Sequence, residues 1–155
     1  MRPHNLFSAG PEDGRLQVLW EDGERALYRG RRAGENGAPD SVLALRLTAE
    51  RPRPASVDRL AHEHRLQDHL EGAWAARPLE LVRDRGQTLL VLEDPGSVPL
   101  DRHIGRPMEA SQFLPLAIGQ VHQRGLVHKD LKPAHILVDG ANGTVRLTGF
   151  GLANR

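Results

Sequence analysis

A single stretch near the end of the chain holds most of the side chains that could do chemistry. It reads His-Lys-Asp-Leu-Lys-Pro-Ala-His-Ile-Leu-Val over 128–138, and Leu-Thr-Gly-Phe-Gly-Leu-Ala follows over 147–153. An imidazole such as His135 can bind a transition metal, but no partner ligands stand at metal-site spacing and the chain has no cysteine. The alternative interpretation is an ordinary solvated loop that carries two charges.

This order of residues resembles two neighbouring protein-kinase motifs, the catalytic loop His-Arg-Asp-x-Lys-x-x-Asn and the turn Asp-Phe-Gly. Lys132, two residues after Asp130, is typical of serine/threonine kinases. Further matches at 22–29 and 92–96 make the chain similar to one bacterial group. In that group a serine/threonine-kinase-like module opens a long hybrid protein that also carries an ATPase region and a sensor histidine kinase. The resemblance runs from about Phe7 to Arg155.

The resemblance implies a role for each matched residue. Asp130 stands where the family has the base that accepts a substrate hydroxyl proton, and Lys132 where a cation meets the transferred phosphate. The two magnesium positions hold His135 and Gly149. Magnesium prefers hard oxygen ligands, which neither residue supplies through its side chain. The resemblance therefore implies ATP as a cofactor and makes magnesium doubtful.

The cation expected on the third strand is Arg46, which follows Leu-Ala-Leu over 43–45. A planar guanidinium is not equivalent to the family's lysine at a tight site. Its expected partner is Glu63 on the next helix, with Glu71 as a second candidate. The alternative is an ordinary surface ion pair.

The resemblance also covers the glycine-rich loop and the hinge between lobes. Trp20, Asp22 and Arg25 occupy the three glycine positions, so an ordinary hairpin turn is favoured over a phosphate-binding loop. The hinge, where backbone groups meet an adenine ring, is expected at Leu92, Glu93 and Asp94. His128 and Phe150 are expected to pack together in the core.

Short elements must position these residues. Hydrophobic periodicity and turn residues predict strands over 16–20, 25–32, 41–48, 79–84, 87–93, 136–138 and 144–148, and helices over 57–70 and 111–124. Ser56 is expected to cap the first helix, and Pro115 to lie in the first turn of the second. With the resemblance, this order implies an α+β kinase-like fold: a five-stranded antiparallel N-lobe with one helix over 1–93, a hinge over 94–97 and an incomplete C-lobe over 98–155.

Composition excludes several classes of protein. The chain has 155 residues, a formal charge of 21 − 20 = +1, 39% hydrophobic and 26% charged residues, which is typical of one globular domain. The balanced charge disfavours a nucleic-acid or anionic-membrane surface, and no apolar run has the length of a membrane span. We expect a cytoplasmic protein.

Three functions stay open at this stage. The chain is an ATP-dependent protein serine/threonine kinase in signalling, a pseudokinase that binds nucleotide or a partner protein, or a decayed fragment. Because it ends four residues after Gly151, we expect the rest of the kinase lobe to be missing. Catalysis would then need the remainder of a longer hybrid kinase, and the chain alone would be impaired.

Overall fold

Two antiparallel sheets make up most of the structure. The computed structural model describes residues 16–33, 39–84, 87–100, 107–139 and 144–154. The larger sheet has the strand order β1-β2-β3-β5-β4 and the smaller one β6-β7-β8. Their bounds are β1 (Gln17–Glu21), β2 (Arg25–Ala33), β3 (Pro39–Leu47), β4 (Pro78–Asp84), β5 (Gln87–Glu93), β6 (Val98–Pro99), β7 (Ile136–Val138) and β8 (Val145–Leu147).

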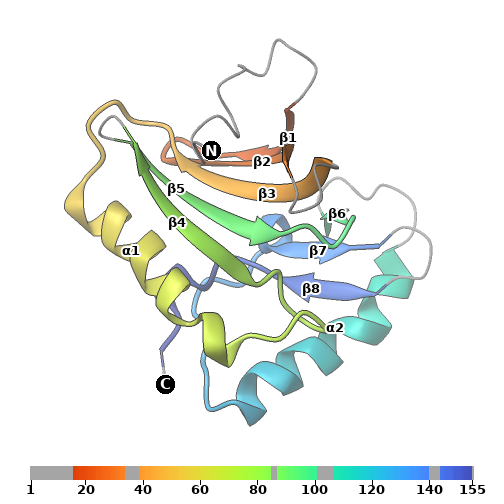
Figure 1. Ribbon diagram of the computed structural model, residues 1–155. Helices are drawn as coiled ribbons and strands as arrows, with labels where there is room; N and C mark the ends of the chain where they lie inside the picture. Colours follow the sequence, from red (N-terminus) through yellow and green to blue (C-terminus); the bar gives the residue numbers. More distant parts are fainter. Residues whose placement is uncertain (1–15, 34–38, 85–86, 101–106, 140–143, 155) are drawn as a thin grey trace.

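Two α-helices and three 3-10 turns complete the described elements. They are α1 (Pro54–Arg65), η3 (Gln67–His69), α2 (Pro107–Gln123), η5 (Pro133–His135) and η6 (Phe150–Leu152). Figure 1 shows α1 along the larger sheet and α2 beneath the smaller one. The expected α+β class and five-stranded antiparallel sheet with one helix are confirmed. Neither α-helix is long and apolar enough, within the described residues, to cross a membrane.

The first helix begins earlier than predicted. Pro54 occupies its first turn and Arg53 is the N-cap, without a side-chain hydrogen bond. A proline is tolerated there because the first N–H groups of a helix have no helical acceptor. The prediction of Ser56 as the cap was wrong, since its hydroxyl is buried and hydrogen-bonds Glu24. The helix also ends at Arg65 instead of 70, and a 3-10 turn follows.

The second helix contradicts the expectation for Pro115. It begins at Pro107, so Pro115 lies inside it instead of in its first turn. Pro115 is exposed, and water can therefore solvate the carbonyl group that the missing N–H leaves without a helical partner. The two-residue strand β6 was not predicted either, because so short a segment carries no periodicity.

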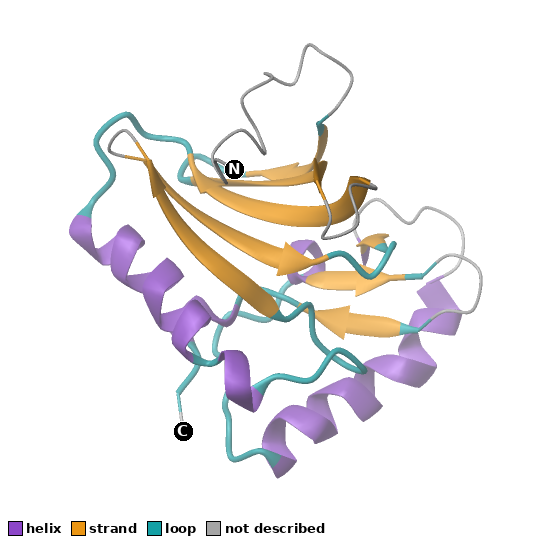
Figure 2. Cartoon of the chain, viewed as in Figure 1, coloured by secondary structure: helices purple, strands orange, loops and turns teal. Residues whose placement is uncertain are grey.

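Strand β7 contributes to the two larger of the three hydrophobic clusters among the described residues. Figure 2 shows it between the larger sheet and β8. Leu137 packs with the larger sheet and Leu60 of α1, whereas Ile136 and Val138 pack with α2, β8 and Phe150. This split follows from strand geometry, in which successive side chains point to opposite faces. Because β7 directly follows η5, the preceding loop is held against both clusters.

Candidate functional site

The loop before β7 is shaped by His128. Its Nε2–H donates to the carbonyl oxygen of Thr148 at 2.6 Å, and its Nδ1 accepts the N–H of Asp130 at 3.1 Å. Burial lowers the pKa of His128, which favours the neutral ring that both contacts require. The ring centroid of His128 lies 4.7 Å from that of Phe150, as the sequence predicted. The loop conformation therefore rests on packed rings and on backbone hydrogen bonds.

His135 occupies the centre of the site and is fully buried. Its Nδ1–H donates to the carbonyl oxygen of Asp130 at 2.6 Å, which leaves Nε2 as an acceptor directed at Arg25. Burial lowers the pKa of His135 to about 4, against its ordinary 6.5. The ring is thus a neutral structural group at neutral pH. Its position among these partners does not supply the oxygen ligand that magnesium prefers.

Gly149 is shaped to fit the ring of His135. Its φ is +76°, in the left-handed region, and a Cβ placed there would lie 2.4 Å from Nδ1 of His135. An aspartate at 149 therefore cannot coexist with this histidine ring at 135. The two residues at the resemblance's metal positions thus present an imidazole and a hydrogen atom where the family has side-chain oxygens. No group of three or more histidine, aspartate or glutamate side chains within the described residues is arranged to hold a metal ion.

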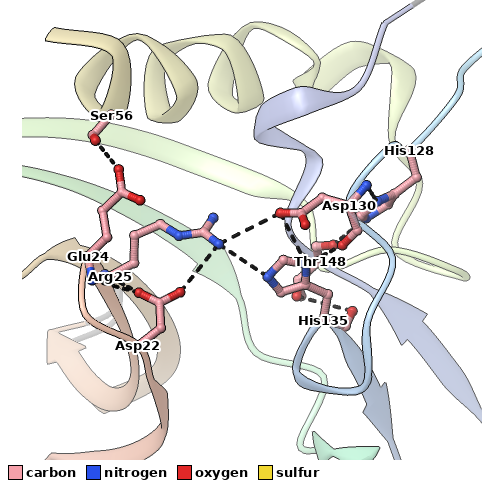
Figure 3. Close-up of polar contacts among 8 residues, drawn as sticks. All are labelled: Asp22, Glu24, Arg25, Ser56, His128, Asp130, His135 and Thr148. Atoms are coloured by element: carbon pink, nitrogen blue, oxygen red, sulfur yellow. Dashed lines mark hydrogen bonds and ion pairs between the residues drawn. The ribbon is translucent and has the colours of Figure 1, made fainter. Parts of the chain in front are cut away.

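Arg25 reaches this loop from the larger sheet (Figure 3). Its Nη2 lies 3.5 Å from Nε2 of His135, 3.8 Å from Oδ2 of Asp130 and 3.7 Å from Oδ2 of Asp22. The guanidinium also lies over the ring of Trp20, 5.3 Å from its centroid. Sequence reasoning placed Arg25 only at a glycine position of the loop. The period-two pattern of β2, with Arg25 on the same face as the core residue Leu27, is the signal that would have found it.

The β1–β2 connection is the tight hairpin that the sequence favoured. Oδ1 of Asp22 accepts the N–H groups of Glu24 at 2.8 Å and Arg25 at 2.7 Å. The side chain of Asp22 thus holds a turn where a phosphate-binding loop would offer free amides. A register shift between Val18 and Trp20 in β1 allows Trp20 to join the same core cluster as its neighbour Leu19.

Glu63 of α1 also lies at this site. It is 1% exposed, and among the described residues neither carboxyl oxygen meets a donor in full hydrogen-bond geometry. Burial raises the pKa of Glu63 to about 7, while the N–H groups of Phe150 and Gly149 and the charge of Arg25 act in the opposite direction. The second candidate, Glu71, instead pairs with Arg124 at the end of α2.

The structure does not bring Arg46 to Glu63, which corrects the expected pair. Arg46 is opposite Ala26 in the β2–β3 register, so it lies on the other face of the sheet from Leu45. Leu45 packs with Leu60 of α1, the helix that carries Glu63. Nη2 of Arg46 donates to Oε1 of Gln87 at 3.1 Å in an exposed contact. Strand alternation therefore makes Arg46 a surface residue, away from the carboxyl it was expected to meet.

The hinge residues follow β5. Leu92 is buried in the core, and the N–H of Glu93 donates to the carbonyl oxygen of Arg77 at 2.8 Å. Asp94 accepts hydrogen bonds from Nε and Nη2 of Arg29 at 2.8 and 2.9 Å. Burial raises the pKa of Asp94, but the bonds from Arg29 and Ser41 outweigh it and hold the pKa below the ordinary value. Pro95 has no N–H, so it offers no donor to an adenine ring.

The other predicted residues are distributed around this centre. Asp130 is about a quarter exposed, and Lys132 lies on the surface of the same loop, where its charge acts on Asp22 and His135. His62 contacts the carbonyl oxygen of Ala153 instead of a ligand group. His103 lies outside the described residues.

Comparison with known proteins finds serine/threonine protein kinases. The chain is 28% identical to ribosomal protein S6 kinase beta of Caenorhabditis elegans over 98% of its own length and 29% of that protein. It is 34% identical to the kinase sid2 of Schizosaccharomyces pombe, over 63% of this chain and 18% of that protein. CBL-interacting protein kinase 4 of rice is 33% identical, over 64% of this chain and 22% of its own length.

No family model matches the chain. The chain spans less than a third of each of these three relatives. These similarities nonetheless support the kinase-like character that the motif at 128–151 indicated, and the five-stranded sheet with one helix is compatible with a kinase N-lobe.

Proposed function

We propose that the chain is part of a protein serine/threonine kinase-like signalling domain, with a nucleotide as its ligand and with magnesium-dependent phosphoryl transfer impaired. The interlocked pair of His135 and Gly149 carries this proposal, because it removes both side-chain oxygens that the resemblance assigns to magnesium. Phosphoryl transfer depends on cations that neutralise the transferred phosphate. Asp130 and Lys132 retain the residue types of a proton acceptor and a phosphate-binding cation.

The finer points of this proposal rest on the same residues. We extend the proposal to a division into an N-lobe over 1–93, a hinge over 94–97 and an incomplete C-lobe over 98–155, in which each of the two larger hydrophobic clusters takes residues from both lobes. The resemblance to modules of bacterial hybrid kinases supports a longer chain or a protein as the partner. Leu92, Glu93 and Asp94 would contact the base of the nucleotide through the backbone, but Pro95 and the bound side chain of Asp94 restrict that contact.

A phosphotransfer assay tests the catalytic part. Purified protein is incubated with radiolabelled magnesium-ATP and a panel of serine- and threonine-containing peptides, beside the Asp130→Asn variant. We expect the two proteins to give the same background signal. Transfer by the unmodified chain that Asp130→Asn abolishes would show that catalysis survives without the usual metal ligands.

A second candidate function is a pseudokinase that binds nucleotide without metal. The position of Arg25 between Asp22 and Asp130 favours it, because a fixed cation already occupies the carboxylate-lined site. Thermal melts with ATP, with and without magnesium, distinguish the two functions. A ligand at 100 times its dissociation constant stabilises a fold by about 2.7 kcal/mol. A shift that is equal with and without magnesium supports the pseudokinase, and a shift that requires magnesium contradicts it.

A further inference from the structure

Arg25 is the buried cation closest to the loop at 128–135 among the described residues. In the β2–β3 register Arg25 is opposite Leu47 and Leu27 is opposite Leu45, and these three leucines belong to the core cluster next to α1. Arg25 therefore projects toward α1 and the loop. Arg46, one residue out of phase, projects to the opposite face.

The carboxyl groups around Arg25 come from separate elements. Asp22 precedes β2, Glu63 belongs to α1, and Asp130 belongs to the loop before β7. The distances from Nη2 to Asp22 and Asp130 are 3.7 and 3.8 Å, longer than charge-assisted hydrogen bonds. Among the described residues, Nε of Arg25 is buried without a hydrogen-bond partner, and the oxygens of Glu63 meet only the N–H groups of Phe150 and Gly149, outside full hydrogen-bond geometry. One guanidinium thus offsets part of the charge of several carboxyls at once, without forming a bidentate pair with Asp22 or Asp130.

The remaining neighbours of Arg25 are neutral and oriented to accept a cation. Nε2 of His135 is an acceptor because Nδ1 carries the proton that binds the carbonyl oxygen of Asp130. The face of the Trp20 ring, which carries partial negative charge, lies beneath the guanidinium. The surroundings of Arg25 therefore favour a cation at this position, and the guanidinium of Arg25 is that cation.

We propose that Arg25 is the built-in counter-ion of this site: it positions the carboxyl of Asp130 and offsets part of the negative charge of Asp22, Asp130 and Glu63, the part that the resemblance assigns to a lysine on β3. This role does not require that the chain transfers phosphate or binds ATP. It makes Arg25 a positioning residue, and it explains how Glu63 stays buried although Arg46 lies on the other face of the sheet.

The pH dependence of stability measures this role directly. The charged and titratable groups that act on Glu63 are Arg25 from β2 and Asp130 from the loop, beside the N–H groups of Gly149 and Phe150. With Arg25 present, the pKa of Glu63 is about 7, so its ionisation is largely complete above that pH. Without Arg25, ionisation of the buried carboxyl is less favourable, and its pKa must rise further. Stability should then continue to fall between pH 7 and pH 9.

The experiment compares melting temperatures of the full chain at pH 7 and pH 9 for Arg25→Met, Arg25→Lys and the control Arg46→Met. We expect Arg25→Met to lose at least 5 °C more than the unmodified chain over this interval, corresponding to roughly 2 kcal/mol for a chain of this length. Arg25→Lys should restore most of the difference, and Arg46→Met should match the unmodified chain. Equal profiles for Arg25→Met and Arg46→Met would overturn the proposal.

A second pair of variants separates the charge of Arg25 from its packing. In Arg25→Met/Glu63→Gln the buried acid is absent, so the additional loss between pH 7 and pH 9 should disappear. If Arg25→Met does not fold, Arg25→Lys and Arg25→Lys/Glu63→Gln give the same comparison, with a smaller expected difference. An additional loss that persists in the Glu63→Gln background would show that Arg25 acts through packing alone. Neither readout involves nucleotide or phosphate transfer, so this result is independent of the kinase assay.

Discussion

Two arginines on the same face of β2 meet their carboxylate partners in different ways. Arg29 forms a bidentate pair with Asp94 at 2.8 and 2.9 Å, and its Nη2 also donates to the carbonyl oxygen of Ser97. In the ion pairs of Arg25, four residues earlier, the shortest distance to a carboxylate oxygen is 3.7 Å. Its Nε is buried and has no hydrogen-bond partner among the described residues. Arg29 thus forms a specific structural ion pair. Arg25 instead lies at longer distance from two carboxylates, Asp22 and Asp130, and interacts with both.

One arginine therefore marks a structural contact and the other a site where a ligand could act. The Arg29–Asp94 contact joins the larger sheet to the hinge with nearly ideal geometry, so disrupting it should affect stability at every pH above the acid range. The Arg25 cluster contains unpartnered polar atoms, which are costly in a dry interior. Such incompletely satisfied buried groups are typical of functional positions more than of purely structural ones.

The largest effect is expected within the Arg25 cluster, at Gly149. Gly149→Ala introduces a Cβ about 2.4 Å from Nδ1 of His135, at a φ that L-residues rarely adopt, and should cost about 3 kcal/mol. Chemical denaturation measures this loss. The control Gly151→Ala brings its Cβ only to 3.2 Å from Arg59 and should cost much less. Similar losses for both variants would contradict the interlocked pair of Gly149 and His135.

The hinge contact should give the next largest effect. Asp94→Ala removes the bidentate partner of a mostly buried guanidinium and should destabilise the chain by about 2 kcal/mol at neutral pH. The exposed Arg77–Glu93 pair, at 3.5 Å in the same region, is the control, and Glu93→Ala should cost only a few tenths of a kcal/mol, roughly. Because the pKa of Asp94 is lowered, its contribution should vanish only as the pH falls below about 4. A loss at pH 3 as large as at pH 7 would argue against the ion pair.

The smallest expected effect is a pH dependence in which two groups oppose each other. The raised pKa of Glu63 makes stability fall as pH rises from about 4.5 to about 7, because the folded state holds the proton more tightly. The lowered pKa of His135 makes stability rise between about 4 and about 6.5, because the unfolded state binds the proton more tightly. In the unmodified chain these slopes partly cancel.

Two single variants should expose the opposing slopes. Glu63→Gln should leave a profile that rises with pH up to about 6.5, and His135→Asn should leave one that falls up to about 7, each by roughly 3 kcal/mol. Stability curves at half-unit pH steps provide the measurement. If both variants keep the profile of the unmodified chain, these two groups do not have the shifted pKa values derived from their burial.

Local sequence patterns were sufficient for most of the fold. The alternation in 25–32 and 79–93 identified strands that the structure confirms within one or two residues, and the motif at 128–138 identified the loop and β7. The patterns failed where tertiary context overrode a local rule. Ser56 hydrogen-bonds another element instead of capping its helix, and Pro115 is accommodated inside a helix because its side of the helix is exposed.

For the candidate site, the residue types could be read from the sequence. Asp130 and Lys132 stand two residues apart, and His135 and Gly149 occupy the positions where the resemblance has the side-chain oxygens that bind magnesium. The sequence also determined that Glu63 was the better acidic candidate on the first helix. The three-dimensional packing was needed to show that Arg25, and not Arg46, lies on the face of the sheet that packs against α1, and that the ring of His135 fills the space beside Gly149. The physical reason is that a shift of one residue in a strand reverses the face to which a side chain points, while burial and charge at a site depend on elements distant in the chain.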